Sequence, residues 1–282
     1  MKKQKQHLVP QVYLKGFGFQ KEEFGGKWFV HVKNLKDGKW QDREIKALLR
    51  EKNFYDIEAN PTNTIRILEK ELHGKIETRF PKIITYLYEN TQITRAIHLD
   101  IAETTANFLC RSKNVLLWIE NILKIKPRKF WNIITEYNWN LHIDKDELFN
   151  RMIVLPEKDR RNKFMVYFMF HVKLILANAK LTVFKNTKGL LLFTNDNPVQ
   201  LPNTGFGELV KPDFECFFAL NPDLLAYFYW KTNTIKVESI KEKLKNDEIT
   251  VLTEELYEFH LQGIIKNLVD EFIISPYKYS NN

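Results

Sequence analysis

Cysteine is scarce in this chain of 282 residues, which contains only Cys110 and Cys216. The two positions lie far apart and neither belongs to a CxxC pair, so the spacing gives no zinc or thioredoxin-type redox motif. Both stand in apolar stretches. We therefore expect two buried free thiols in a protein of a reducing compartment.

Long hydrophobic runs are also missing. The longest apolar stretch, Phe164–Ala179, is interrupted by His171 and Lys173 and is too short to span a bilayer. The basic first residues are not followed by an apolar segment, which a secretory signal peptide requires. We therefore expect a cytoplasmic protein without a membrane partner.

Several well-known catalytic motifs are absent. The sequence has no P-loop, no GxGxxG fingerprint, no HExxH and no GxSxG. These motifs carry phosphate binding, dinucleotide binding, zinc-dependent proteolysis and serine hydrolysis, respectively. Their absence argues against classical nucleotide hydrolysis, dinucleotide redox chemistry and α/β-hydrolase chemistry.

Apolar and basic residues are plentiful. Hydrophobic residues make up 44% of the chain and aromatic residues 13%, which is enough for a sizeable core. Without an internal repeat or a low-complexity linker, residues 1–282 predict one compact domain. The net charge of +8 favours a polyanionic partner, and nucleic acid is the commonest one. The alternative is a generally lysine-rich composition, because the positive charges are spread along the chain.

The first part of the chain predicts a small β element. Residues 7–19 read as half extended and half helical, because Pro10 biases the residue before it toward an extended conformation. Residues 27–32 predict a strand, residues 36–39 a turn and Trp40 onward the return strand. Residues 53–57 add a short extended piece.

The middle of the chain has helical periodicity. A helix is expected from Thr64 toward Tyr88, kinked or restarted at Pro81, and another from Thr94 to about Lys124. Proline suits the first turn of a helix, and two further helices are accordingly expected from Pro127 and Pro156.

The period then changes to that of strands. Residues 181–184 and 190–193 predict a hairpin, and residues 215–220 and 225–230 continue the sheet before a helix from Asp247 to about Ile273. Strands grouped apart from helices indicate an α+β fold. The predicted order is a small N-terminal β element, a helical middle, a second antiparallel β region and a C-terminal helix.

The first candidate site lies at the start of the chain, where His7, Gln11 and Tyr13 follow each other closely. Histidine acts as a general acid or base near neutral pH, so we assign His7 and Gln11 to a catalytic group and Tyr13 to substrate binding. The alternative is an N-terminal latch, in which Tyr13 and its apolar neighbours pack into the core and His7 binds a backbone carbonyl.

A second polar group, Asn195, Asp196 and Asn197, directly follows a predicted strand. Strand ends present polar residues to clefts, so Asp196 is a candidate base and the two asparagines are candidate substrate ligands. The alternative is an Asx-turn, in which these side chains bind their own backbone and Pro198 ends the strand.

Three further residues complete the candidate set. Glu69 and Glu77, with His73 between them, lie along one side of a predicted helix, where they would hold a divalent metal such as Mg²⁺ or Mn²⁺. Arg111 would bind a phosphate bidentately. The alternatives are a solvated helix face and a structural salt bridge.

Two stretches of the sequence together resemble a known family. They are HLVPQVYLKGF from His7 and FTNDNPV from Phe193, accompanied in order by residues 53–55, an acidic helix at 69–77, Arg111 and residues 218–222. This pattern is similar to a bacterial family described as domain of unknown function 4238. The family usually has a serine where this chain has Asn195, which argues against a hydroxyl nucleophile there. The resemblance implies a fold and candidate positions and no reaction.

The leading hypothesis is a bacterial enzyme acting on a phosphate-containing polyanion, most simply a nuclease. His7 would be the acid or base, Asp196 with Glu69 or Glu77 would hold a metal or orient water, and Arg111 would stabilise phosphate charge. A toxin or phage-defence role would suit such an enzyme. The alternatives are a non-catalytic module that binds nucleic acid or a nucleotide, and a structural protein in which both motifs serve packing.

Overall fold

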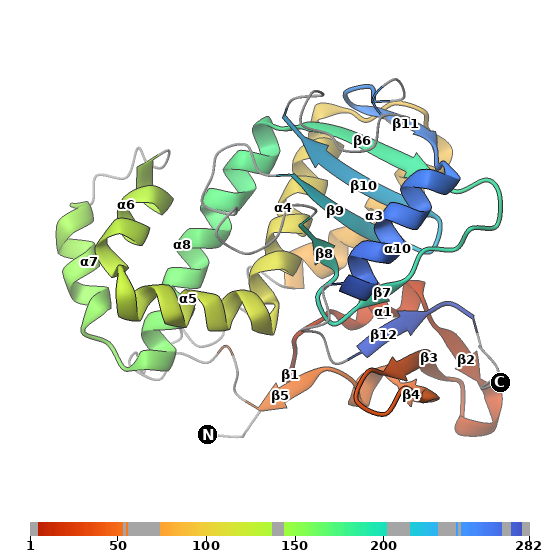
Figure 1. Ribbon diagram of the computed structural model, residues 1–282, viewed down its shortest axis with the longest axis horizontal. Helices are drawn as coiled ribbons and strands as arrows, with labels where there is room; N and C mark the ends of the chain where they lie inside the picture. Colours follow the sequence, from red (N-terminus) through yellow and green to blue (C-terminus); the bar gives the residue numbers. More distant parts are fainter. Residues whose placement is uncertain are drawn as a thin grey trace.

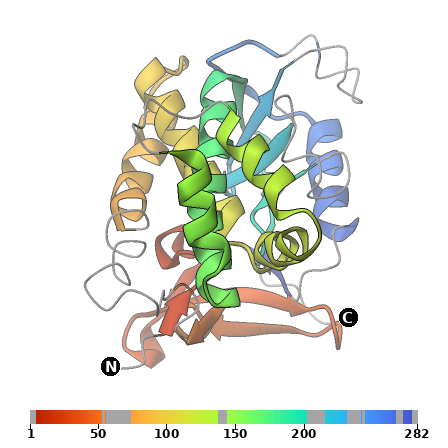
Figure 2. The same ribbon diagram turned by 90° about the vertical axis from the view of Figure 1, so that its left-hand side faces the viewer.

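The computed structural model confirms the α+β class. It describes residues 5–52, 55, 74–136, 144–201, 215–230, 241, 244–266 and 272–277. In two perpendicular views the N-terminal strands lie along one side of the molecule, with the helices and the second sheet above them (Figures 1 and 2). Within the described residues, no helix has the length and apolar character that crossing a membrane requires.

The N-terminal region forms a small two-stranded sheet, in which its first and last strands pair, and most of a five-stranded sheet, which we call the first sheet. Its elements are β1 (Lys5–His7), α1 (Gln11–Gly16), β2 (Phe19–Lys21), the 3₁₀ turn η1 (Glu22–Phe24), β3 (Lys27–Asn34), β4 (Trp40–Glu44), the 3₁₀ turn η2 (Ile45–Ala47) and β5 (Arg50–Lys52). The predicted hairpin is confirmed, because β3 and β4 pair antiparallel around the turn. The predicted strand at 53–57 lies, apart from Tyr55, outside the described residues.

The helical middle forms a layer beside the sheets (Figure 2). Its elements are α3 (Gly74–Glu89), α4 (Arg95–Arg111), α5 (Lys113–Ile125), α6 (Pro127–Glu136), α7 (Lys145–Ile153) and α8 (Glu157–Asn178). The starts expected at Pro127 and Pro156 are confirmed, and Pro81 lies inside α3. The single helix expected from Thr94 to Lys124 is wrong. Ser112 is extended, and its hydroxyl accepts a hydrogen bond from the Val115 amide, which caps a new helix.

The second sheet is mixed. Its strands are β6 (Lys180–Lys185), β8 (Val199–Gln200), β9 (Cys216–Asn221), β10 (Leu224–Tyr229) and β11 (Glu248–Val251), in the order β11-β6-β10-β9-β8. The hairpin predicted between residues 181–184 and 190–193 is wrong, because β6 pairs antiparallel with β10 and parallel with β11. Because β10 and β11 occupy the two hydrogen-bonding edges of β6, residues 190–193 do not pair with β6.

The last part of the chain returns to the first sheet. The helix predicted from Asp247 to Ile273 is shorter than expected: α10 (Glu254–Lys266) lies between β11 and a final strand, β12 (Phe272–Ser275). β12 pairs antiparallel with both β3 and β7 (Thr194–Asn195), giving the order β2-β3-β12-β7, with β4 also on β3. The N-terminal β element is therefore completed by late parts of the chain.

One cluster of buried hydrophobic side chains extends from α1 through the helices into both sheets. Cys110 and Cys216 belong to it and are free thiols, as expected. Burial raises the pKa of both thiols above its ordinary value, so they are unreactive at neutral pH. That residues 1–282 form one domain stays a prediction.

Candidate functional site

The sequence places His7 at the end of a strand and directly before a helix. His7 is the last residue of β1 and is the register partner of Arg50 on β5. Pro10 then precedes α1, and Gln11 is the first residue of this helix. The Gln11 side-chain amide donates a hydrogen bond to Nε2 of His7 over 2.9 Å. The four-residue spacing of the motif therefore brings the two predicted catalytic residues together.

Arg111 also binds His7. It is the last residue of α4 and is 2% exposed. Its guanidinium donates one hydrogen bond to the main-chain carbonyl of His7 and another, over 3.3 Å, to Glu77 of α3. The hydroxyl of Tyr55 donates to the Arg111 carbonyl over 2.9 Å. The structure thus joins four predicted site residues, which we call the His7 group: His7, Gln11, Glu77 and Arg111.

The surroundings of His7 favour its neutral form. Burial lowers the pKa of the imidazole most, an interaction with the Leu48 backbone raises it in part, and the positive charges of Arg50 and Arg111 lower it further. Because Gln11 donates to Nε2, the proton of the neutral ring lies on Nδ1. A neutral half-buried imidazole can accept a proton at Nε2 when Gln11 turns away.

Two polar atoms in the His7 group are buried without a hydrogen-bond partner. They are Nε of Arg111 and Nδ1 of His7, whose contact with the Leu48 backbone lacks the geometry of a full hydrogen bond. Buried polar atoms of this kind are rare in folded proteins and occur at sites of strain or of binding. The hydrogen bonds from Gln11 to the ring and from Arg111 to the main-chain carbonyl hold His7 in its orientation.

Of the two predicted metal ligands, Glu69 and Glu77, the structure describes only Glu77. The carboxylate of Glu77 pairs with Arg111 and is therefore already neutralised. Glu69 and His73 lie outside the described residues. Among the residues that the structure describes, no three His, Cys, Asp or Glu side chains gather as a metal site would require. A divalent metal at Glu69 and Glu77 stays a prediction.

The second motif lies at the junction of the two sheets. It connects β7 of the first sheet with β8 of the second. The Asn195 side chain accepts a hydrogen bond from the Asn197 amide over 3.0 Å, so the Asx-turn interpretation is confirmed for Asn195. Asp196 accepts a hydrogen bond from the Phe272 amide at 3.4 Å, which ties the motif to β12. The side-chain oxygen of Asn197 is buried without a partner.

Tyr13 links the two motifs inside the core and is not placed to meet a substrate. Its side chain is fully buried, and burial raises the pKa of its hydroxyl strongly. The hydroxyl shares a hydrogen bond of 2.7 Å with Thr194 and donates another of 2.8 Å to the Ala219 carbonyl. Its ring stacks on that of Phe218. For Tyr13, predicted to bind substrate, the structure therefore supports the alternative of an N-terminal latch.

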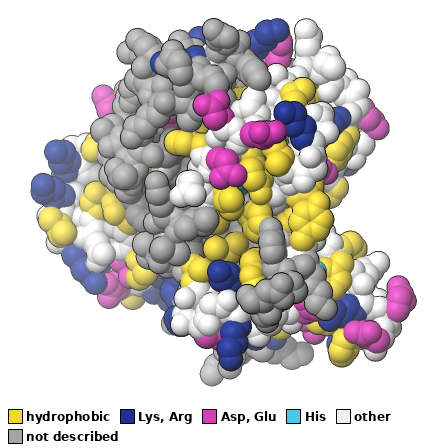
Figure 3. Space-filling model, turned by 45° about the vertical axis from the view of Figure 1, so that its right-hand side comes forward, with side chains coloured by type: hydrophobic (Ala, Val, Ile, Leu, Met, Phe, Trp, Pro, Cys, Tyr) yellow, Lys and Arg dark blue, Asp and Glu magenta, His cyan; other side chains and the backbone are white. Residues whose placement is uncertain are grey.

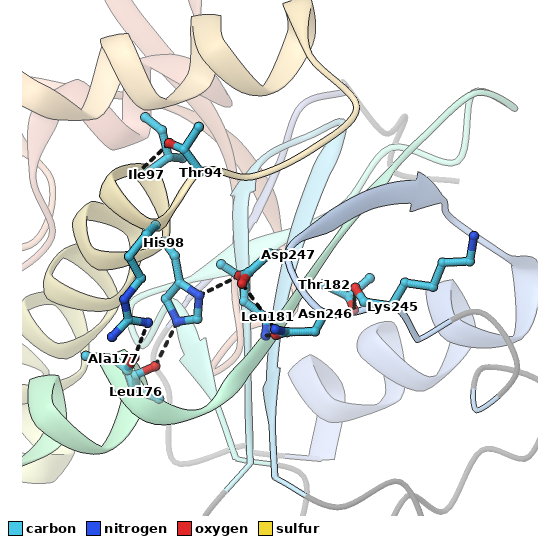
Figure 4. Close-up of polar contacts among 11 residues, drawn as sticks. Thr94, Ile97, His98, Leu176, Ala177, Leu181, Thr182, Lys245, Asn246 and Asp247 are labelled. Atoms are coloured by element: carbon cyan, nitrogen blue, oxygen red, sulfur yellow. Dashed lines mark hydrogen bonds and ion pairs between the residues drawn. The ribbon is translucent and has the colours of Figure 1, made fainter.

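The sequence alone missed Arg50 and a buried His98–Asp247 pair. Nδ1 of His98 lies 2.6 Å from the Asp247 carboxylate, and Nε2 lies 3.1 Å from the Leu176 carbonyl (Figure 4). Asp247 has a positive φ of 58°, which a non-glycine residue rarely adopts. Since His98 is 1% exposed, this pair fastens α4, the end of α8 and the start of β11 together. The separation of 149 residues left no local signal.

A second His–Asp pair lies on the first sheet. Nδ1 of His31 is 2.6 Å from Asp42, its register partner on β4, and Lys21 pairs with the same carboxylate. Burial alone would raise the pKa of Asp42, but the hydrogen bonds and charges of Lys21 and His31 outweigh it and lower the pKa. The hairpin register, once predicted, would have indicated this pair.

Comparison with known proteins agrees with the resemblance seen in the motifs. Neither the curated proteins nor the solved structures gave a significant match. A family model described as "Protein of unknown function (DUF4238)" matches residues 5–272, which is nearly the whole chain. The match includes the His7 group, the Tyr13 latch and the Asn195 turn. This chain therefore belongs to the DUF4238 family.

Proposed function

We propose that this protein is an enzyme that cleaves phosphodiester bonds of nucleic acid, with His7 as the residue that takes up and returns a proton. The observation that carries the proposal is the environment of His7. Its pKa is lowered by burial and by two arginines, so the ring is neutral and able to act as a base at neutral pH. Positive charge beside a base is the arrangement that a phosphate substrate needs.

Arg50 is the residue that we assign to phosphate binding. It is half-buried, lies opposite His7 in the β1–β5 pair and acts on the His7 ring through its charge. The sequence suggested Arg111 for this role. Arg111 is buried, however, and its guanidinium already donates hydrogen bonds to His7 and Glu77. We therefore assign Arg111 to positioning His7.

The proposed step uses these residues in a simple order. Arg50 binds the phosphate, and a hydroxyl group or a water molecule approaches the phosphorus atom. Nε2 of His7 accepts the proton of this nucleophile as the new P–O bond forms. The opposite P–O bond breaks, and His7 returns the proton to the leaving oxygen. Gln11 releases Nε2 at the start, and it donates to Nε2 again once the transfer of the proton to the leaving oxygen has left the ring neutral. Asp196 has no part in this step.

The test is an activity assay on purified full-length protein with single-stranded and double-stranded RNA and DNA. Each substrate is offered with Mg²⁺, with Mn²⁺ and with a chelator, because a metal at Glu77 and Glu69 stays open. His7→Asn should lower the rate by at least about a hundredfold. Gln20→Ala, a polar substitution on the exposed part of β2, is the control and should keep full activity. Turnover that His7→Asn leaves unchanged would contradict the proposal.

The competing function is non-catalytic binding of nucleic acid, favoured by the positive net charge of the protein. Saturable binding without turnover on any substrate would support it over the enzyme. A toxin or phage-defence role is tested separately by producing the wild type and His7→Asn in growing bacteria. Growth arrest or reduced phage plating that needs His7 would support that role.

A further inference from the structure

The outward side of α5 carries a basic stripe that begins beside the His7 group. Its exposed residues are Lys113, Leu117, Asn121, Lys124 and Ile125. The first four follow at intervals of three or four residues, and Ile125 is four residues from Asn121, so all five lie along one side of the helix. The one carboxylate in α5 is Glu120, and Arg161 already binds it at 2.9 Å. The stripe therefore presents cations, an amide and apolar side chains, with its carboxylate neutralised.

The stripe continues into the start of α6. Lys126, Arg128 and Lys129 are exposed there. Lys124 pairs with Glu157, and Arg128 pairs with Asp146. For Lys126 and Lys129, the described part of the chain offers no carboxylate within ion-pair distance. Lys126 and Lys129 therefore place positive charge that no described carboxylate compensates just beyond the end of α5.

The near end of the stripe adjoins the proposed site in both sequence and space. Lys113 follows the buried Arg111 by two residues and pairs with Glu51 over 3.5 Å. Glu51 is the direct neighbour of Arg50 on β5. Figure 1 shows α5 running from the lower end of α4, near β1 and β5, to the outer side of the helical layer. The left edge of Figure 3 shows Lys and Arg side chains together with hydrophobic and a few acidic ones.

We propose that this stripe binds the backbone of a single-stranded nucleic acid whose scissile phosphate lies at His7. The inference rests on the proposed function and adds the substrate class. A helix of 13 residues is about 20 Å long, which matches about six stacked nucleotides at a rise of 3.4 Å. Lys113 meets a phosphate at one end of this length, and Lys126 and Lys129 meet phosphates at the other, so the site extends beyond the scissile bond.

The apolar side chains of the stripe favour a single strand over a duplex. Ile125 is 72% exposed and Leu117 47% exposed, and both stand between the cations. Unpaired bases offer flat apolar faces to such side chains, whereas a duplex keeps these faces stacked inside. A duplex would leave Ile125 and Leu117 exposed to water, so only the positive charges of the stripe would contribute to its affinity for a duplex.

The experiment measures binding by fluorescence anisotropy with the full chain and fluorescein-labelled oligonucleotides of three and twelve residues. The variant is Lys126→Glu/Lys129→Glu. It should weaken binding of the single-stranded 12-mer at least tenfold and leave the 3-mer unchanged. The salt dependence of 12-mer binding should also become shallower by about 1.4 in log–log slope, since two phosphate contacts are lost. Lys36→Glu/Lys39→Glu, in the turn after β3, is the control with an equal change of charge.

The outcomes separate this inference from the proposed function. If the stripe variant binds the 12-mer like the wild type while His7→Asn abolishes cleavage, the proposed binding role of the stripe is refuted and the proposed enzymatic function is supported. If the stripe variant loses binding, the control variant does not, and no substrate is cleaved, the binding role is supported and the enzymatic function is refuted. Equal losses in the stripe variant and the Lys36/Lys39 control would refute the stripe, because general charge would then explain the binding. Tighter binding of a duplex 12-mer would refute the single-stranded substrate.

Discussion

The hydroxyl group of Tyr13 lies 2.7 Å from that of Thr194, although 181 residues separate them in the chain. The same Tyr13 hydroxyl donates to the Ala219 carbonyl on β9. Three stretches that mark the family therefore meet at one buried oxygen: the start of the chain, the segment around Thr194 and the strand that contains Ala219. The motif at the N-terminus holds the two sheets together as well as presenting His7.

Tyr13→Phe tests this latch. The change removes the hydroxyl and leaves the Thr194 hydroxyl and the Ala219 carbonyl without this partner in the core, so we expect a loss of about 2 kcal/mol in the free energy of unfolding. Urea unfolding followed by circular dichroism measures it. Tyr277→Phe, on a half-exposed ring, is the control and should change stability by less than about 0.5 kcal/mol. Equal effects of the two changes would argue against the latch.

Arg111→Met tests the support of His7. The substitution keeps most of the side-chain volume but leaves the His7 carbonyl and the Glu77 carboxylate without their donor. We expect a loss of about 3 kcal/mol in stability, mainly from the buried contact with His7. Glu77→Gln should cost less than 1 kcal/mol, since this carboxylate is more than a third exposed. If Glu77→Gln proved the costlier change, the ion pair and not the His7 carbonyl would be the main support.

Local sequence signals predicted those features that depend on neighbouring residues. The hairpin around residues 36–39, the helix starts at Pro127 and Pro156 and the pairing of His7 with Gln11 each follow from a turn, a proline or a four-residue spacing. The buried thiols followed from their apolar surroundings in the same way.

Features decided by distant residues were missed or misread. β6 pairs with β10 and β11, which arrive from far along the chain and displace the hairpin that the local pattern favoured. Ser112 reads as one polar residue in a helix, and only the packing of α4 and α5 shows that it caps a new one. The carboxylate of Asp196 accepts a hydrogen bond from the Phe272 amide, a contact that no local pattern indicated, and its catalytic role stays a prediction.

Arg50→Gln tests the electrostatic part of the site. The Arg50 charge lowers the pKa of His7, so removing it should raise that pKa toward the ordinary value of 6.5. The imidazole proton signals of the full chain, followed by NMR from pH 5 to pH 8, report the change. Arg43→Gln on the exposed side of β4 should leave the His7 titration unchanged. A His7 pKa that fell in Arg50→Gln would contradict the proposed geometry.

His260 should make the fold sensitive to acid. This buried histidine has a pKa lowered to about 4 by burial, whereas an unfolded histidine titrates near 6.5. Above pH 6.5 His260 is neutral in both the folded and the unfolded chain, so its titration costs no stability there. Between pH 6.5 and pH 4 the unfolded chain binds the proton more readily, and stability falls by about 3 kcal/mol in total. Urea midpoints at pH 7, 6 and 5 measure this loss. His260→Gln should flatten this part of the profile, and an unchanged slope would show that other groups cause it.

Gly18 and Gly16 offer a matched pair for testing how closely the N-terminal motif packs. A Cβ atom on Gly18 would lie 2.7 Å from the Phe29 carbonyl oxygen of β3, a distance at which the backbone has to shift. Gly18→Ala should therefore cost about 2 kcal/mol in the free energy of unfolding.

A Cβ atom on Gly16 would meet only the Asn221 Cβ at 3.5 Å, an ordinary contact, and Gly16 lies in α1. Gly16→Ala should be neutral or stabilise the fold by up to about 1 kcal/mol, because alanine favours helix. Because both changes add one methyl group two residues apart, a difference in stability between them measures the contact of this loop with β3. Equal stabilities would mean that α1 can move away from the sheet, and His7 would then lack the fixed position that its proposed role requires.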